Sequence, residues 1–253
     1  MNLLAVERIK LFSTRSPWWC ALITLALALG FAAIFASAQS ADTPVTLSAT
    51  LFGGTQFGIA VVMVLAALAV TTEYRFNTIR TTFQAVPHRS PALVAKAIVL
   101  AVVALVLGEL AAFGALGLGM LMRPNDGLGL HSSQDWMNVA GLGPVFAISA
   151  VLAVALGVLI RHSAGAIALL LIYYLAVEEL VQLIPKIGHT IHEWLPFNVA
   201  NKFLRGSAVI DGDGGGPAPS DSPLSPGWAL AYFAGIALVF LLVALGVAKK
   251  RDA

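Results

Sequence analysis

The stretch of sequence that decides the fold is residues 96–122, KAIVLAVVALVLGELAAFGALGLGMLM. Apart from Lys96 at its start and Glu109 near its middle, every residue in this stretch is apolar or glycine. A helix needs roughly 20 such residues to cross about 30 Å of membrane hydrocarbon. The sequence therefore predicts a membrane-spanning helix over residues 96–122.

Outward from residues 96–122, five further apolar stretches are long enough to cross a membrane. They are residues 18–38, 51–71, 139–160, 164–184 and 228–248. Three of the six spans follow a Ser-Pro pair, and proline is favoured in the first turn of a helix. The predicted fold class is an all-α integral membrane protein with six transmembrane helices in a single domain.

The composition excludes several other classes of protein. Of the 253 residues, 58% are hydrophobic and 11% are charged, whereas a soluble domain carries about 25% charged residues. The formal net charge is +2, without a basic stripe that could neutralise phosphates, which argues against nucleic-acid binding. Cys20 is the single cysteine, so a disulfide scaffold is excluded.

The distribution of Lys and Arg predicts that both termini face the cytoplasm (N-in and C-in). With this orientation the cytoplasmic segments carry 11 Lys and Arg residues and the opposite side carries 4, which is the bias seen in membrane proteins. The first span ends in Ala36-Ser37-Ala38, which has the form of a signal-peptidase site. Its apolar run is longer than the roughly 7–15 residues of a signal peptide, so an uncleaved anchor is favoured.

Two cytoplasmic segments have an amphipathic pattern. Residues 1–17 alternate apolar and charged residues, which fits either a helix in the inner interface or an ordinary basic flank. In the loop 72–90, Asn77 can cap a short helix, Ile79 and Phe83 share a face, and Pro87 ends it. This second helix is expected either to lie on the membrane surface or to dock into a groove on a cytoplasmic partner.

The external segment before the last span has two parts. Residues 185–205 are predicted to form two short amphipathic helices that bend at Pro196 and dip into the outer leaflet. Irregular backbone at that depth needs protein or a wet cavity around it. In residues 206–226, 16 of the 21 residues are Gly, Pro, Ser or Asp, which predicts a mobile external loop.

Taken in order along the chain, these segments resemble the permease subunits of type-2 ABC exporters, particularly short actinobacterial-looking ones. The resemblance rests on the N-terminal segment from Glu7 to Trp18, on six spans with both ends inside, and on the two patterned loops. It implies that the loop after the second span is a coupling helix that contacts the ATPase, through Glu73, Tyr74, Arg75, Ile79, Arg80, Phe83, Gln84 and Pro87. It also implies an external re-entrant hairpin that includes Trp194, Pro196, Phe197 and Asn198.

The same resemblance predicts the partners and the cofactors. Such a permease pairs with a second permease chain, here expected to be an identical copy, and with two cytoplasmic ATPase subunits that bind ATP and Mg. The sequence contains no G-x-x-x-x-G-K-[ST] motif, so ATP hydrolysis has to come from another polypeptide. The expected function is export of a hydrophobic or amphipathic lipid, drug or peptide across the bacterial cytoplasmic membrane.

Three carboxylates lie inside the predicted spans, at Glu109, Glu178 and Glu179. Because a charge in lipid costs at least about 2.5–3.5 kcal/mol, each should face the bundle interior, water or a partner. The three residues either line a substrate path or form structural ion pairs. For Glu178 and Glu179 the cations available on the same side are Arg123, Lys186, Lys202 and Arg205.

Two other functions remain as alternatives. A Glu-Glu pair before a His-rich segment resembles glutamate-type intramembrane proteases, but the Arg of their E-E-x-x-x-R motif is missing here. His189, His192 and Glu193 share a helix face that could hold a metal, although a solvated polar face is the simpler interpretation. A stand-alone channel or ion-coupled carrier would use the intramembrane carboxylates as proton or cation sites.

Small residues recur at four-residue spacing in two spans and permit close helix packing. They are Ala28, Ala32 and Ala36 in the first span and Ala111, Ala115 and Gly119 in the third. The sequence leaves open whether these stripes pack within the chain or form a dimer seam.

Overall fold

The computed structural model describes residues 3–39, 45–79, 89–124, 128–205 and 220–251, and these residues form helices joined by turns and short irregular segments. Six helical segments in them are long and apolar enough to cross a membrane, which confirms the prediction of an all-α protein with six transmembrane helices. They are Ser16–Ala38, Gly53–Arg75, Ser90–Met122, Leu142–Ile160, Ser163–Val181 and Pro226–Lys250. The third span begins earlier than predicted, at a Ser-Pro pair that fits the first turn of a helix.

Four of the spans are single helices. They are α2 (Ser16–Ala38), α6 (Arg89–Met122), α8 (Leu142–Ile160) and α13 (Pro226–Arg251). The second span consists of the π-helix η1 (Gly53–Gly58) and α4 (Ile59–Arg75), and the fifth of α9 (Ser163–Ile172), the π-helix η2 (Tyr173–Val177) and α10 (Glu178–Val181). The short helices are α1 (Leu3–Phe12), α3 (Leu47–Thr50), α7 (Ser133–Ala140), α11 (Gly188–His192) and α12 (Pro196–Arg205).

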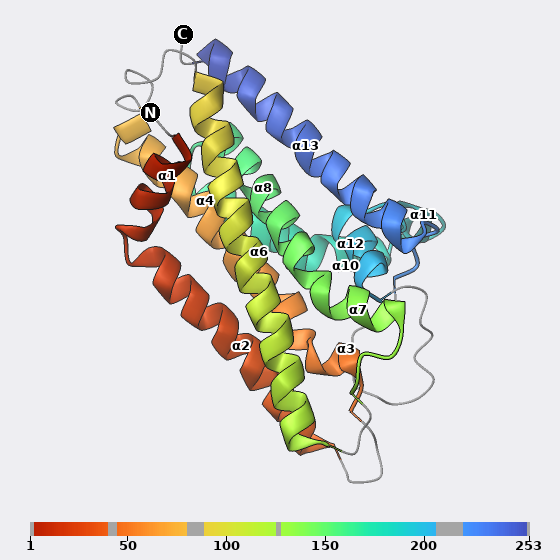
Figure 1. Cartoon of the computed structure of the whole chain (residues 1–253). Helices are drawn as coiled ribbons and strands as arrows, with labels where there is room; N and C mark the ends of the chain where they lie inside the picture. The colour runs from red at the N-terminus through yellow and green to blue at the C-terminus, as the bar shows by residue number, and fades with distance from the viewer. Residues whose placement is uncertain (1–2, 40–44, 80–88, 125–127, 206–219, 252–253) are drawn as a thin grey trace.

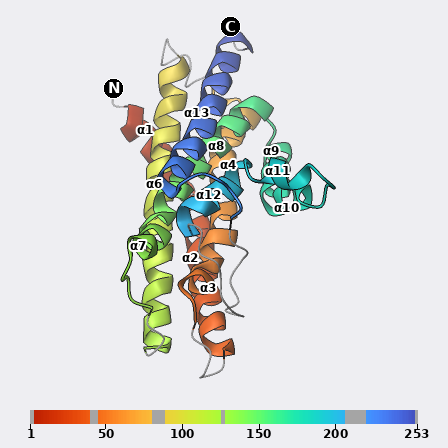
Figure 2. The ribbon, with the colours of Figure 1, turned by 90° about the vertical axis from the view of Figure 1, so that its right-hand side faces the viewer.

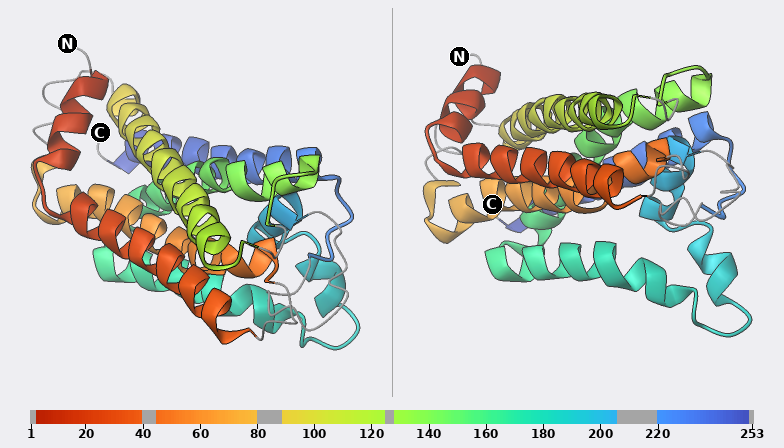
Figure 3. Two further views of the ribbon diagram at one scale, coloured as in Figure 1. Left: turned by 60° about the horizontal axis from the view of Figure 1, so that its bottom comes forward. Right: turned by 90° about the horizontal axis from the view of Figure 1, so that it is seen from below.

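The spans are arranged around a central pair of helices, α4 and α8 (Figure 1). In the most apolar part of each span, 67% of the residues are buried for the second span, which contains α4, and 61% are buried for α8. The corresponding fractions are 22% for the fifth span and 17% for α13. Figures 2 and 3 show α9 and α10 standing at one side of the bundle. Both termini lie at the same end, as an even number of spans requires, and we call this the terminal end (Figure 1).

The two stripes of small residues pack against other helices of the same chain. Ala28 and Ala32 on α2 and Ala111 and Ala115 on α6 are all buried, and α2 packs along α6. A methyl group added to Gly54 of η1 would lie within 4 Å of the Cβ atoms of both Ala28 and Ala111. The stripes therefore bring α2, η1 and α6 into close contact within one subunit.

The two π-helical turns meet at one hydrogen bond. The N–H of Ile59 donates to the carbonyl of Gly54, five residues back. After this bond the backbone returns to α-helical pairing, in which each N–H bonds to the carbonyl four residues back. The carbonyl oxygen of Thr55 therefore has no N–H partner in the helix. The hydroxyl of Tyr174, in η2, donates to that oxygen at 2.6 Å. The irregular turns thus join the second span to the fifth.

The segment before the last span folds into the two short helices α11 and α12, with the bend before Pro196. Helix α12 packs against α13 rather than beyond its end (Figure 1). Phe197, at the start of α12, contacts the rings of Tyr174 and Phe233, with centroid distances of 4.5 and 5.5 Å. The hairpin is therefore anchored to the fifth and sixth spans by aromatic packing.

Candidate functional site

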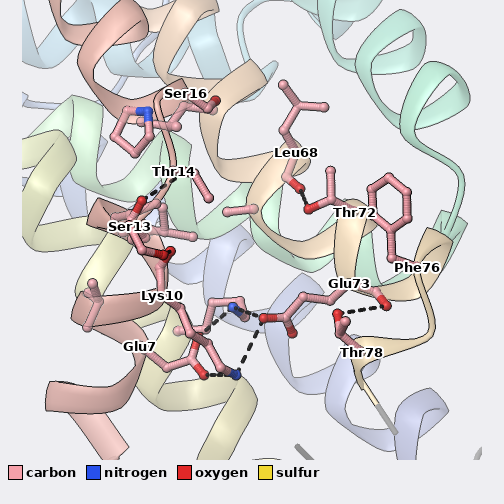
Figure 4. Close-up of a pocket in the computed structure, with 17 residues that line it drawn as sticks. Glu7, Lys10, Ser13, Thr14, Ser16, Leu68, Thr72, Glu73, Phe76 and Thr78 are labelled. Carbon is pink, nitrogen blue, oxygen red and sulfur yellow. Dashed lines mark hydrogen bonds and ion pairs between the residues drawn. The ribbon is translucent and has the colours of Figure 1, made fainter. Parts of the chain in front are cut away.

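Four charged side chains from three separate elements meet at the terminal end of the bundle (Figure 4). They are Glu7 and Lys10 on α1, Glu73 near the end of α4, and Lys96 near the start of α6. Lys96 Nζ lies 2.5 Å from Glu7 Oε2 and 3.0 Å from Glu73 Oε1. Lys10 Nζ lies 2.8 Å from Glu7 Oε1 and 3.5 Å from Glu73 Oε1. Each carboxylate thus contacts both ammonium groups, and we call the four residues the charge cluster.

The charge cluster is largely removed from solvent. The side chains of Glu7 and Lys96 are 4% and 8% exposed, and that of Glu73 is 13% exposed. Burial alone would raise the pKa of Glu7, but the charge of Lys96 and the hydrogen bonds from both lysines outweigh it and leave the pKa below its ordinary value. Burial alone would lower the pKa of Lys10, but its contacts with Glu7 and Glu73 leave it raised. Glu7 and Lys10 are therefore charged at neutral pH.

The position of the charge cluster is informative because Glu73 and Lys96 flank the segment predicted to contain the coupling helix. Glu73 precedes that segment by a few residues, and Lys96 lies in the second turn of the helix that follows it. The ion pairs therefore hold both ends of the segment against α1. Buried pairs of this kind resist separation, because removing one partner leaves an uncompensated charge.

The predicted coupling residues have different environments. Glu73 points into the charge cluster rather than outward, and Tyr74 lies beneath the guanidinium of Arg161, 4.9 Å from the ring centroid. Arg75 is exposed and lies over the ring of Phe76, and Ile79 is buried. The remaining predicted residues lie outside the residues that the structure describes: Arg80, Phe83, Gln84 and Pro87.

A second polar group lies at the hairpin. Glu178 is buried, and its two carboxylate oxygens accept hydrogen bonds from the backbone N–H groups of Phe197 and Asn198, at 3.1 and 2.8 Å. These N–H groups belong to the first turn of α12, where no helical acceptor is available to them. Glu178 is thus bound by the N-terminus of a helix.

Asp221 also belongs to this polar group, through its contacts with His192 and Asn198. Its carboxylate contacts Nδ1 of His192 at 2.9 Å and accepts from the side-chain amide of Asn198 at 2.6 Å. Nε2 of His192 lies 2.9 Å from the amide nitrogen of Gln182. Burial alone would raise the pKa of Asp221, but the bonds from His192 and Asn198 leave it lowered. We call Glu178, Gln182, His192, Asn198 and Asp221 the hairpin network.

The other intramembrane carboxylates do not join Glu178. Glu179 is exposed and its carboxylate is 3.4 Å from the amide nitrogen of Gln182, so the adjacent glutamates have separate environments. Glu109 is half-buried on α6, and its carboxylate lies directly over Gly143 of α8. A Cβ atom at residue 143 would overlap that carboxylate. Glycine at this position therefore makes room for Glu109.

Trp194 and His189, which the sequence also singled out, make contacts in or beside the hairpin. The backbone carbonyl of Trp194 accepts from the hydroxyl of Tyr232 at 3.2 Å, and its ring contacts that of Tyr232. His189 Nδ1 lies 3.2 Å from Glu193 and 3.4 Å from Asp221. Among the described residues, no group of three or more His, Cys, Asp or Glu side chains has the geometry of a metal site.

Sequence reasoning missed five members of these two groups: Glu7, Lys10, Lys96, Gln182 and Asp221. The sequence places Glu7 and Lys10 in the amphipathic N-terminal segment, Lys96 at the start of a span and Asp221 in a loop expected to be mobile, without indicating their contacts. In the structure Asp221 is hydrogen bonded, and the neighbouring Ser220 hydroxyl donates to the carbonyl of Asn198 at 2.8 Å. The position of Lys96 did indicate a contact, because a cation at the start of an apolar span needs either an ion-pair partner or a place at the membrane interface.

Comparison with known proteins agrees with this architecture. The model of one family, described as ABC-2 family transporter protein, matches residues 3–177. The match extends from α1 to η2 and includes all four residues of the charge cluster. Among curated proteins, none matches the chain. Because the family match covers more than half of the 253 residues and six helices can cross a membrane, the chain belongs to the ABC-2 transporter family and is a multi-pass membrane subunit of an ABC transporter.

Proposed function

We propose that this chain is the permease of an ATP-driven exporter that moves a hydrophobic or amphipathic substrate out across the bacterial cytoplasmic membrane. Membrane subunits of the ABC-2 family generally work with an ATPase partner. In the proposed assembly, two ATPase subunits bind ATP and Mg, and two copies of this chain surround the path. Both termini and the charge cluster face the cytoplasm, in agreement with the Lys and Arg bias.

The observation that carries this proposal is the charge cluster. Force from an ATPase has to enter the permease through a cytoplasmic element that is rigidly joined to the spans. The segment between α4 and α6 is held at both ends by ion pairs to α1, through Glu73 and Lys96. A push on this segment would therefore move α1, α4 and α6 as one body.

The proposed role of the segment between α4 and α6 can be tested by labelling in the assembled exporter. A cysteine replacing Gln84 is expected to cross-link to the ATPase subunit and to be shielded from a membrane-impermeant label only when that subunit is present. A cysteine replacing Ser37, exposed at the opposite end of α2, serves as the matched control and should label equally in both cases. Equal labelling at residue 84 with and without the ATPase would contradict coupling through this segment.

Coupling itself can be tested with charge exchange. In Glu73→Lys or Lys96→Glu alone, the cluster holds three like charges and one opposite charge, and we expect ATP hydrolysis to persist while transport into vesicles falls at least tenfold. The double variant restores one pair of opposite charges between α4 and α6 and should recover part of the transport. If both single variants transport as well as the parent, the charge cluster does not couple hydrolysis to movement.

A further inference from the structure

A cavity of about 650 Å³ lies beside the charge cluster (Figure 4). It is lined by the corner between α1 and α2, by the last turns of α4 and by the second and third turns of α6. Binding sites for small molecules are typically about 300–1,000 Å³. The cavity is therefore large enough for a ligand and lies apart from the hairpin network and from Glu109.

The walls of the cavity change from polar to apolar with depth. On α4, Thr72 and Glu73 lie near the terminal end, and Leu65 and Leu68 lie one to two turns deeper in the bundle. On α6, Lys96 lies near that end and Leu100 lies one turn deeper. Because both helices end at the predicted membrane surface, the polar part of the cavity is at headgroup level and the apolar part is at the level of acyl chains. This gradient matches an amphiphilic molecule.

Three hydroxyl groups around the polar part, those of Ser13, Thr14 and Thr72, can only accept hydrogen bonds from a ligand. A hydroxyl has one hydrogen to donate and two lone pairs. Ser13 donates its hydrogen to the carbonyl of Lys10 at 2.8 Å, Thr14 to that of Leu11 at 2.9 Å, and Thr72 to that of Leu68 at 2.6 Å. The lone pairs of these oxygens therefore remain for a ligand that supplies the donor.

The charges around the cavity are already balanced. Both ammonium groups of the charge cluster contact both carboxylates, so the two positive and two negative charges neutralise each other. An anionic head would have to compete with Glu7 and Glu73 for the lysines. The surroundings therefore favour a head with N–H or O–H donors over an acidic one.

We propose that this cavity binds an amphiphile whose head donates hydrogen bonds, either a primary ammonium or a hydroxyl. The head lies among the oxygens of Ser13, Thr14 and Thr72, and the apolar body lies along Leu68 and Leu100. The ligand enters from the inner leaflet beneath α1. This site goes beyond the proposed transport function, because it lies within one subunit and requires neither ATP nor a second copy of the chain.

The proposal can be tested with three photoreactive probes that share one alkyl chain and differ in the head. The full-length protein in nanodiscs is irradiated with a primary ammonium, a hydroxyl or a trimethylammonium probe, and labelled peptides are located by mass spectrometry. We expect the first two probes to label the 65–72 and 96–100 segments at least fivefold more than the third, because trimethylammonium has no donor. Equal labelling by all three probes would overturn the proposal.

Two variants and a matched control separate binding from partition into the lipid. Leu68→Trp fills the cavity, and Val64→Trp adds the same side chain on α4 outside the cavity lining. Labelling should fall at least fivefold in Leu68→Trp and stay at the parent level in Val64→Trp. Thr72→Val, which removes one acceptor without changing shape, should reduce the preference for donor heads even if Leu68→Trp fails to fold. Unchanged labelling in both Leu68→Trp and Thr72→Val would overturn the site.

Competition identifies the source of the ligand. If phosphatidylethanolamine in the nanodisc displaces the ammonium probe and phosphatidylcholine does not, the natural ligand is a membrane lipid. If only a free alkylamine or alkanol displaces it, the ligand is a soluble amphiphile. Displacement by none of these compounds would show that the cavity does not select for donor heads.

Discussion

The charge cluster and the hairpin network both fix a short helix to the bundle, but they do so by different chemistry. At the terminal end, Glu7 and Lys10 of α1 contact Glu73 and Lys96 through side chains alone. At the hairpin, Glu178 accepts from two backbone N–H groups of α12, and Asp221 contacts a histidine and an amide. One attachment depends on balanced charge, and the other depends on the geometry of a helix end.

This difference determines how each attachment responds to change. A set of alternating charges fails when one member is removed, because the remaining like charges lie close together without compensation. A carboxylate at a helix N-terminus loses only its own hydrogen bonds when it is replaced. The charge cluster is therefore expected to be the more sensitive of the two, and it lies where transmission of force is proposed.

The largest effect is expected for Lys96→Met. This variant leaves Glu7 and Glu73 with only the partly exposed Lys10 between them, and breaking a buried ion pair costs about 3–5 kcal/mol. We expect a lower thermal midpoint in detergent and faster hydrogen exchange in α1. The triple variant Glu7→Gln, Glu73→Gln, Lys96→Met removes the two buried carboxylates, leaves only the charge of the partly exposed Lys10, and should regain part of the loss. A neutral effect of Lys96→Met would show that α1 is held by packing alone.

An intermediate effect is expected for Glu178→Ala. The backbone N–H groups of Phe197 and Asn198 then lose their acceptor, and leaving buried donors unsatisfied costs about 1–3 kcal/mol. Hydrogen exchange should accelerate in α12 and remain unchanged in α1. Glu178→Gln retains one acceptor oxygen and should cost less, and Glu179→Ala, at an exposed position, should cost little. If α12 exchanges at the parent rate in Glu178→Ala, packing of Phe197 rather than the carboxylate fixes the hairpin.

The smallest effect is expected from pH, and its direction distinguishes the two attachments. The lowered pKa values of Glu7 and Asp221 mean that both contribute stability above their ordinary values of 4.5 and 3.8 and lose it in acid. The raised pKa of Lys10 means that its contribution is complete below 10.5 and is lost as the pH rises above that value. Alkaline pH should therefore loosen the attachment of α1, because Lys10 loses its charge. The contribution of Asp221 to the hairpin should not change in this range.

This difference can be measured with fluorophores on Arg8→Cys and Ile191→Cys, which lie at exposed positions on α1 and α11. Accessibility to a quencher at residue 8 should rise above pH 10.5, with an energy of about 1 kcal/mol or less because Lys10 is partly exposed. The alkaline change should be absent in Lys10→Met. A parallel change at residue 191 would indicate general unfolding instead.

The sequence was sufficient for the architecture because the fold is set by the length and apolarity of the spans. Residues 96–122 identified a membrane helix, and the structure extends it to Ser90 at a Ser-Pro start. The bend before Pro196 was also predictable, since proline cannot continue a helix from its N-terminal side but readily begins one.

The sites were less predictable because they depend on contacts between distant residues. Glu7 and Lys96 are 89 positions apart, and nothing in the periodicity of either segment indicates the pair. The partner of Glu178 is a pair of backbone N–H groups, which no count of charged residues can reveal. The small-residue stripes show the same limit, because spacing predicts close packing without identifying the neighbour.

The π-helical turns have a consequence for how sequences of this kind can vary in length. Each wide turn accommodates one extra residue within an otherwise continuous helix. Deleting one residue from Gly53–Gly58 would restore ordinary pairing and rotate the preceding helical turns by about 100° relative to α4. The same deletion would supply a backbone donor to the Thr55 carbonyl that now accepts from Tyr174. Sequences that lose a residue in this turn are therefore expected to lose the tyrosine hydroxyl as well, so that a gap in one span is accompanied by a Tyr-to-Phe change in another.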